Sequence, residues 1–456
     1  MLLVLTMLFC GAWRETEAAP IEALRYSVTP SRLRFVLDSR ERISYKINKT
    51  GKEIAVDLLD SSCKSSRPAV KDSLLQSVEL QGVDRHKGRL LLKLNKDCQY
   101  QCFTLTNPHR LVIDLFKIVK KDISRELEYG VDYRFLQDEL NGRPYQSHII
   151  TVKPASVYEL RPFSAAGNYT GRASLAKMAQ NLGLPVAVNA SYFDTDGWVV
   201  GVTKSKGRLL SVEESPHSAY ILTHKQPGII KDVAYSGYLE LKDGGRLPIK
   251  GMNRMRIADD CVIYNEAFAT HTHTNRWGRE IRIRNGRVEA VSTLGNMPIE
   301  PGTMVVSGHG SSAAALKEFS IGDPAKLVES LGNTAAEEAE VVVGAGPLLI
   351  EQGKINVRTR EESIAQDIAV GRAPRTALGI TADGSLLLVV VDGRSSSSQG
   401  MSLQELAEFM LQLGAKDALN LDGGGSSEMV LKGRIVNHPS DGRERPVSIG
   451  LGLFRK

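Results

Sequence analysis

The chain has 456 residues, which is too long for a single small module and predicts two to four domains. Hydrophobic residues make up 42% and charged residues 24%, so the chain can bury a sizeable core and lacks the composition of a disordered protein. The net charge of +6 is small for this length, which argues against a nucleic-acid-binding protein, because such proteins gather Lys and Arg on one face.

Residues 1–19 have the pattern of a signal peptide. An apolar run at residues 2–12 is too short to span a bilayer, and the small residues Ala18 and Ala19 follow it. No Lys or Arg precedes the run, and the alternative interpretation is a buried N-terminal strand. We favour export, because polar residues end the run abruptly; the expected location is the periplasm, the cell wall or the extracellular space. No later segment reaches 18 uninterrupted apolar residues, so no transmembrane segment is expected in the mature chain.

Four cysteines follow this segment, at Cys63, Cys98, Cys102 and Cys261. Four thiols in so long a chain do not make a disulfide scaffold, and a zinc site would need more convergent ligands. The sequence leaves open whether they are buried free thiols or include one disulfide.

An internal repeat organises residues 20–121. At an offset of 57 residues, segment 32–38 aligns with 89–95 and segment 54–59 aligns with 111–116. All four segments are apolar and partly alternating, which is typical of strands. The repeat predicts a small, all-β, sandwich-like domain that is internally duplicated.

The paired segments Val56-Asp57-Leu58 and Ile113-Asp114-Leu115 resemble strands of the AMIN domain, a β module found on exported envelope proteins. The resemblance implies binding to cell-wall glycan, which makes peptidoglycan the expected partner of this domain. A structural spacer without a ligand is an equally good interpretation.

Residues 126–456 differ from the preceding part of the chain, because strand-like runs alternate with helical stretches there. We expect the catalytic domain in these residues. A helical stretch at 173–182 precedes Gly183, and a second helix begins with Ser402 as its N-cap and Glu405 at the third position. The mixture predicts an α+β or mixed α/β fold. The apolar, strand-like runs that alternate with helices are residues 148–152, 186–188, 341–343 and 386–391.

Polar clusters follow several of these apolar runs, and residues 420–427 form the most informative one. Asn420 and Asp422 share strand parity, so both side chains point to one side of the pleat. The glycines that follow let backbone N–H groups approach a ligand closely, as in an anion-binding nest, and two hydroxyl donors come next. A simple turn needs fewer glycines and serines than this. These residues are Gly423, Gly424, Gly425, Ser426 and Ser427.

Four ordered motifs resemble the signatures of the phosphodiester glycosidase family, and the resemblance extends over residues 126–456. One motif departs from the family pattern: the usual Asn-Gly-Gly-Phe-Phe is here Asn-Ala-Ser-Tyr-Phe, which bears on substrate fit. The resemblance implies hydrolysis of the bond between a sugar and a phosphate diester, of the GlcNAc-1-phosphodiester type. The motifs are NASYF at 189–193, PRTA at 374–377, DGR at 392–394 and NLDGGGS at 420–426.

Catalytic roles follow from this resemblance. Phosphate leaves readily, so the reaction needs a cation that clamps the diester, and Arg375 fits that role. Asp422 and Asp392 fit the carboxylate roles, but the sequence does not decide which is nucleophile or base, nor whether the reaction retains or inverts configuration. The expected substrate-binding residues are Asn189, Asn420, Gly423, Gly424, Gly425, Ser426, Ser427, His309 and Arg394.

Two hypotheses remain at this stage. In the first, the chain is an exported glycosidase acting on envelope or extracellular glycans; in the second, it is a non-catalytic cell-wall glycan-binding protein. Two carboxylates beside a cation favour the enzyme. No cofactor is expected, and the His271 and His273 pair leaves a divalent metal as a minority interpretation.

Overall fold

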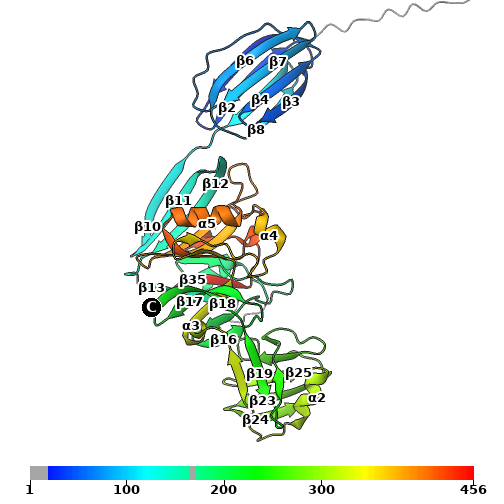
Figure 1. Ribbon diagram of the computed structural model, residues 1–456, viewed down its shortest axis with the longest axis vertical. Coiled ribbons are helices and arrows are strands. Elements are labelled where there is room, and N and C mark those ends of the chain that lie inside the picture. The colour runs from blue at the N-terminus through cyan, green and yellow to red at the C-terminus, as the bar shows by residue number, and fades with distance from the viewer. Residues whose placement is uncertain (1–18, 165–170) are drawn as a thin grey trace, which may run out of the picture. The chain divides into compact units, whose positions relative to one another are not determined.

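The computed structural model describes residues 19–164 and 171–456, which form two compact units (Figure 1). The first unit contains the residues up to Val119 and Asn141–Arg143, and the second contains Lys120–Leu140 and Pro144–Lys456. Residues 1–18 of the predicted signal peptide (residues 1–19) lie outside the described residues, and its last residue, Ala19, begins the first strand. None of the described helices is long and apolar enough to cross a membrane.

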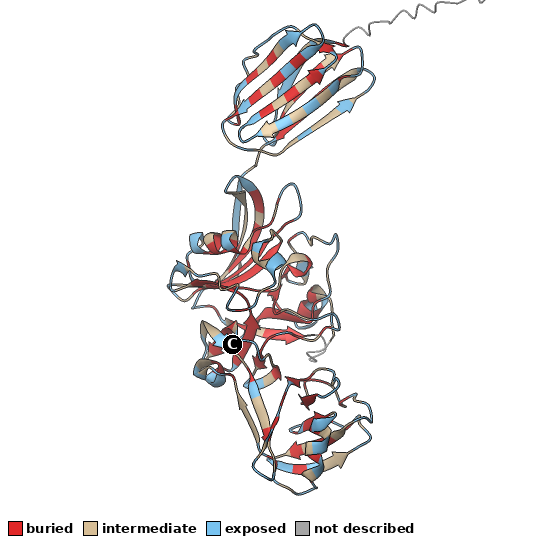
Figure 2. Cartoon of the chain, turned by 45° about the vertical axis from the view of Figure 1, so that its right-hand side comes forward, coloured by how far each residue is buried: buried red, intermediate tan, exposed pale blue. Residues whose placement is uncertain are grey.

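The first unit consists of two β-sheets packed face to face around one apolar core. Residues along its strands alternate between buried and exposed, as period-two side-chain placement requires (Figure 2). One sheet has the order β5-β1-β2-β9-β8, with β1 (Ala19–Val28), β2 (Arg32–Ser39), β5 (Ser61–Ser62), β8 (Tyr100–Leu105) and β9 (His109–Phe116). The other has the order β3-β4-β7-β6, with β3 (Ser44–Thr50), β4 (Glu53–Leu59), β6 (Leu75–Asp84) and β7 (Lys87–Leu94).

The repeat in the sequence corresponds to a repeat of strands. Strands β1, β2, β3 and β4 of the first copy match β6, β7, β8 and β9 of the second. The two copies interlock, because β2 pairs with β9 in one sheet and β7 pairs with β4 in the other. Each sheet therefore needs strands from both copies, and neither copy can close the core alone.

The described residues of the second unit form five sheets. The eight-stranded sheet has the order β10-β11-β12-β31-β30-β32-β28-β29, with β10 (Lys121–Glu128), β11 (Val131–Leu140), β12 (Arg143–Val152), β28 (Leu348–Glu351), β29 (Lys354–Ile355), β30 (Arg375–Thr381), β31 (Leu386–Val391) and β32 (Ala415–Asn420). A five-stranded sheet has the order β13-β35-β14-β33-β34, with β13 (Tyr158–Ser164), β14 (Val186–Asn189), β33 (Met429–Leu431), β34 (Arg434–Ile435) and β35 (Ile449–Arg455).

Three further sheets come from the middle of the chain. The first has the order β16-β15-β27-β17-β18, with β15 (Thr203–Ser205), β16 (Arg208–Ser211), β17 (His217–Thr223), β18 (Gln226–Val233) and β27 (Val341–Ala345). The second has the order β20-β19-β26, with β19 (Ser236–Glu240), β20 (Arg246–Pro248) and β26 (Leu327–Ser330). The third has the order β21-β22-β25-β23-β24, with β21 (Gly251–Met252), β22 (Cys261–Tyr264), β23 (Arg279–Arg284), β24 (Arg287–Ser292) and β25 (Met304–Gly308).

The expectation of an α+β or mixed α/β catalytic domain is wrong. Strands make up 50% of the structure and helices 9%, and the described strands pair antiparallel almost throughout. The helices are short: α1 (Leu175–Asn181), α2 (Ser311–Ala315), α3 (Thr334–Glu338), α4 (Gln366–Val370) and α5 (Leu403–Gln412).

The error has a physical cause that β31 illustrates. A continuous apolar run usually indicates a parallel strand between layers of helices. Here Leu388 and Val390 face one core while Leu387 and Val389 face another, which α5 helps to close. The antiparallel sheet is covered on both faces, so its strand carries no polar alternation.

The sequence pattern at the start of α5 predicted the local structure correctly. Helix α5 begins with the predicted capping box, in which the Ser402 hydroxyl accepts from the Glu405 N–H and the Glu405 carboxylate accepts from the Ser402 N–H. The open question about the cysteines is answered within the described residues, where Cys63, Cys98, Cys102 and Cys261 are free thiols.

Candidate active site

Asp422 lies just beyond the end of β32, where the chain passes from the large sheet into the glycine turn. Its N–H donates to the Ala190 carbonyl at 2.8 Å, which ties it to the segment following β14. Its side-chain Oδ1 accepts from the Gly423 N–H at 2.8 Å, and the Ser426 hydroxyl also contacts the carboxyl. Burial raises the pKa of Asp422 to about 6, against the opposing effects of Ser426, Gly423 and Arg445. Asp422 is half-buried, and a pKa of about 6 suits a group that exchanges protons near neutral pH.

Asn189 positions Asp422 from the neighbouring sheet. Its Nδ2 donates to the Asp422 carbonyl at 2.6 Å, and its Oδ1 accepts from the Thr376 hydroxyl at 2.7 Å and the Glu428 N–H at 3.0 Å. Because both ends of this amide are used inside the protein, the structure places Asn189 as a support for the site.

Asn420 has an unfilled acceptor. Its Nδ2 donates to the Gly346 carbonyl at 2.8 Å and to the Tyr192 hydroxyl at 3.1 Å. Its Oδ1 is buried without a hydrogen-bond partner among the described residues, as is the Ser427 hydroxyl. Buried polar atoms are rarely left unpaired in a folded protein, so these two atoms are unused hydrogen-bonding groups beside Asp422.

The glycine turn (residues 423–427) is less open than an anion-binding nest. The Gly424 N–H donates to the Pro374 carbonyl at 2.8 Å, and the Ser426 N–H donates to the Gly423 carbonyl at 3.2 Å. The Ser427 N–H donates to the Gly424 carbonyl at 3.2 Å. These N–H groups hold the turn itself, so backbone donors alone do not make this an anion site.

Arg375 is buried at the start of β30. Its Nε donates to the Met401 carbonyl at 2.9 Å, and its Nη2 donates to the carbonyls of Ile368 at 3.1 Å and Gly371 at 2.6 Å. These carbonyls lie in and just after α4 and immediately before the N-cap of α5. Arg375 therefore joins two helix ends, and it forms no ion pair with Asp392 or Asp422 in the described structure.

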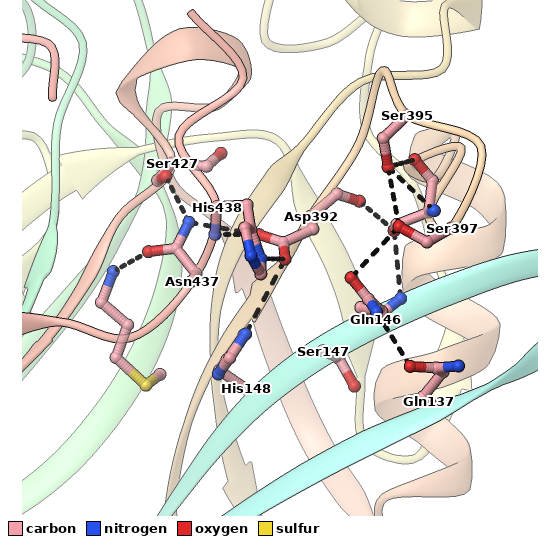
Figure 3. Close-up of polar contacts among 12 residues, drawn as sticks. Gln137, Gln146, Ser147, His148, Asp392, Ser395, Ser397, Ser427, Asn437 and His438 are labelled. Carbon is pink, nitrogen blue, oxygen red and sulfur yellow. Dashed lines mark hydrogen bonds and ion pairs between the residues drawn. The ribbon is translucent and has the colours of Figure 1, made fainter. Parts of the chain in front are cut away.

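Asp392 is buried between two histidines (Figure 3). Its Oδ2 lies 3.2 Å from Nδ1 of His438 and 3.8 Å from Nε2 of His148, and its Oδ1 accepts from the His438 N–H at 3.0 Å. Burial raises the pKa of Asp392, but the contacts with His148 and His438 outweigh it, so the pKa lies below its ordinary value. Nδ1 of His148 in turn lies 2.9 Å from the Tyr133 hydroxyl.

The two histidines differ in exposure, and sequence reasoning missed both. His148 is buried on β12, whereas the His438 side chain is 84% exposed. A buried carboxylate that holds an exposed imidazole is an arrangement that can transfer a proton to or from a ligand. No local pattern marks either histidine, because β12 and residue 438 meet Asp392 only through the fold.

The segment 437–445 is a second part of the site that the sequence did not reveal. Asn437 anchors it, since its Nδ2 donates to the Ser427 carbonyl at 3.0 Å. Asp441 then binds Arg445, with 2.9 Å between Oδ2 and Nε, and its Oδ1 lies 3.6 Å from Nη1 of Arg394. The segment thus brings Asp441 and Arg445 to the glycine turn, where they meet Arg394 from the loop after β31.

His309 lies in a different part of the second unit. Its N–H donates to the Asp260 carbonyl at 2.9 Å, and its Nδ1 accepts from the Asp259 N–H at 3.1 Å. These contacts belong to the loops around β25, so the structure does not join His309 to the residues around Asp422. Within residues 19–164 and 171–456, no group of three or more His, Cys, Asp or Glu side chains is arranged to hold a metal ion.

A pair of carboxyl groups lies beside the site. Glu444 accepts from the Ser174 hydroxyl at 2.7 Å and the Ala176 N–H at 3.0 Å at the start of α1, and it also contacts Glu428. Burial, reinforced by Glu444, raises the pKa of Glu428 to about 9. Glu428 is therefore protonated at neutral pH and can donate a hydrogen bond to Glu444.

This pair predicts a stability that depends on pH. Because the folded pKa of Glu428 lies above its ordinary value of 4.5, the stabilisation is complete below about pH 4.5 and is lost as the pH rises towards 9. Glu428→Gln keeps a hydrogen-bond donor and cannot ionise, so we expect it to raise the unfolding free energy at pH 8 by on the order of 3 kcal/mol. Thermal melts from pH 5 to 9 measure this. The matched control is Glu338→Gln at an exposed position of α3. The same dependence of melting temperature on pH in wild type and Glu428→Gln would contradict the assignment.

Comparisons with known proteins relate this site to a family. Residues 278–454 match the sequence model of the phosphodiester glycosidase family. A segment of 90 residues is 40% identical to an uncharacterized prophage-derived protein of Bacillus subtilis, and one of 67 residues is 46% identical to bovine N-acetylglucosamine-1-phosphodiester alpha-N-acetylglucosaminidase. These segments are 20% and 15% of this chain, and they span only 14% and 12% of the two relatives.

A solved structure shows a similar fold. The crystal structure of a hypothetical protein from Synechocystis matches with a TM-score of 0.67 and 22% identity, covering 96% of this chain and 81% of that chain. The matched family supports a glycosidase-type, hydrolytic function for the part of the chain that contains the site.

Proposed function

We propose that this protein is an exported glycosidase that hydrolyses sugar-1-phosphodiester linkages in envelope or extracellular glycans. The observation that carries the proposal is the half-buried Asp422, whose pKa of about 6 and position on the glycine turn suit a carboxylate acting on a sugar. The match of residues 278–454 to phosphodiester glycosidases supports the same reaction. The unpaired acceptor of Asn420 and the unpaired hydroxyl of Ser427 would bind the substrate's hydroxyl groups.

Asp422 and Asp392 would have different roles in the reaction. The bond between the anomeric carbon and the phosphate oxygen breaks, its electron pair leaves with the phosphate, and water supplies a hydroxyl group to the carbon. Asp422 would stabilise the positive charge that develops on the sugar. The exposed imidazole of His438 would accept the proton from water, and Asp392 would orient the imidazole and stabilise its positive charge.

Incubation with a GlcNAc-1-phosphodiester tests the proposal. We expect free GlcNAc and the phosphate monoester to appear in equal amounts. The alternative, a non-catalytic glycan-binding protein, predicts that the diester binds and is recovered intact.

The first unit would tether the enzyme to the cell wall. It has its own apolar core of buried residues from both sheets, so we expect residues 19–119 to fold alone. We predict that this fragment, after a cooperative thermal transition has been verified, sediments with purified peptidoglycan sacculi. A folded fragment that stays in the supernatant would leave the unit as a spacer.

A further inference from the structure

Two exposed arginines flank the glycine turn and share one carboxylate. Asp441 accepts from Nε of Arg445 at 2.9 Å and lies 2.6 Å from its Nη2, while Nη1 of Arg394 lies 3.6 Å from the other carboxylate oxygen. The Arg394 and Arg445 side chains are 50% and 41% exposed. Asp441 therefore has two guanidinium groups as partners.

The glycines explain how both guanidinium groups can lie so close to the turn. At Gly425, an added Cβ would meet Nη2 of Arg445 at 2.1 Å and Oδ2 of Asp441 at 2.3 Å. At Gly424, whose φ is +61°, it would meet Nη2 of Arg394 at 3.4 Å. A side chain at residue 425 would therefore displace the Arg445 guanidinium. The absence of a side chain at Gly425 leaves the space that this guanidinium occupies.

One of these cations, Arg445, also acts on the Asp422 carboxyl. Arg445 lowers the pKa of Asp422, so the guanidinium lies within electrostatic range of that group. In contrast to Arg375, whose described hydrogen bonds all go to backbone carbonyls, Arg394 bonds within the described residues through Nη1 alone, to the Ser440 hydroxyl at 3.1 Å. Its remaining N–H groups face no partner in that part of the structure and can bind an anion.

We propose that Arg394 and Arg445 form the phosphate clamp of this site and that Asp441 positions them. The inference rests on the proposed function. It assigns the binding of the phosphate to Arg394 and Arg445 in place of Arg375. Each guanidinium offers a planar pair of N–H donors to one non-bridging oxygen of a phosphate diester. The shared carboxylate holds two like charges side by side when no ligand is bound, and Asp422 lies next to them to act on the attached sugar.

Binding of inorganic phosphate, followed by phosphorus NMR, tests the clamp without any need for turnover. We expect Arg394→Gln and Arg445→Gln each to weaken phosphate binding about ten- to a hundredfold, the value of one charge-assisted hydrogen bond. Arg443→Gln is the matched control, because Arg443 is an exposed arginine of the same segment. Equal affinities of all three variants and wild type would overturn the clamp.

A charge-preserving variant guards against loss of folding. Gly425→Ala keeps every charge and introduces one methyl group where the Arg445 guanidinium lies, and a flexible side-chain end can move away without unfolding the chain. We expect an unchanged melting temperature with phosphate binding weakened at least about fivefold. Unweakened binding in Gly425→Ala would show that the position of Arg445 does not matter and would contradict the proposal.

Turnover separates this inference from the proposed function. If wild type cleaves a GlcNAc-1-phosphodiester and Arg394→Gln and Arg445→Gln cleave it equally well, the clamp is wrong and the glycosidase stands. If wild type cleaves no phosphodiester but binds phosphate in a manner that needs Arg394 and Arg445, the anion site stands and the glycosidase is wrong.

Discussion

Asp422→Asn is expected to reduce the turnover of a GlcNAc-1-phosphodiester by about a thousandfold or more. The asparagine has the same size and can still accept the Gly423 N–H, so only the negative charge is lost. Steady-state rates of free sugar release measure the effect. The control is Asp196→Asn, which makes the same change at an exposed position in the loop after β14.

Stability measurements show whether the variant is folded. The pKa of Asp422 is raised from 3.8 to about 6, so this group lowers the unfolding free energy as the pH rises from about 4 to 6. Removing the charge removes that cost, and the melting temperature of Asp422→Asn at pH 7 should equal or exceed that of wild type. A variant that is equally stable and fully active would exclude Asp422 from the reaction.

The same pKa is expected to set the acidic limb of the activity profile. If Asp422 acts as a carboxylate, the free enzyme loses activity as this group is protonated, so kcat/KM should fall about tenfold for each pH unit below about 6. A profile of wild type from pH 4 to 8 measures the limb. Activity that stays level down to pH 4 would mean that the charge of Asp422 is not used.

Sequence patterns predicted what depends on neighbouring residues. The capping box of α5 needs only Ser402 and Glu405, three positions apart, and it forms as expected. The cluster from Asn420 to Ser427 was recognisable for the same reason, since its glycines and hydroxyl groups are adjacent in the chain. Its unpaired Asn420 Oδ1 and Ser427 hydroxyl lie within that cluster.

Properties that depend on distant segments could not be predicted in this way. His148 and His438 meet at Asp392 from segments 290 residues apart, and nothing in either segment indicates the partner. The predicted fold class was wrong, and β31 shows why: burial on both faces removes the polar and apolar alternation that distinguishes an antiparallel strand. Whether an arginine is exposed, as Arg394 is, or buried, as Arg375 is, also follows only from packing.

Arg375 is the residue for which this matters most, and Arg375→Lys separates the two roles it could have. If Arg375 is the phosphate clamp expected from the sequence, Arg375→Lys should lose more activity on phosphodiesters than on an aryl glycoside, because the leaving group of the aryl glycoside has no anionic oxygens. The hydrogen bonds to Met401, Ile368 and Gly371 favour a scaffold instead. One ammonium group cannot reach three carbonyls in the fork geometry of a guanidinium.

We therefore expect Arg375→Lys to lower the unfolding free energy by roughly 3–5 kcal/mol, because buried carbonyls lose their donors. For a unit of this size, that corresponds to a fall in melting temperature of about 10 °C. Activity on the two substrates, measured well below the transition, should fall by the same factor. The control is Arg360→Lys at an exposed position. A selective loss on the phosphodiester with an unchanged melting temperature would return the clamp to Arg375, because a residue that only joins α4 to α5 has no means of distinguishing the two leaving groups.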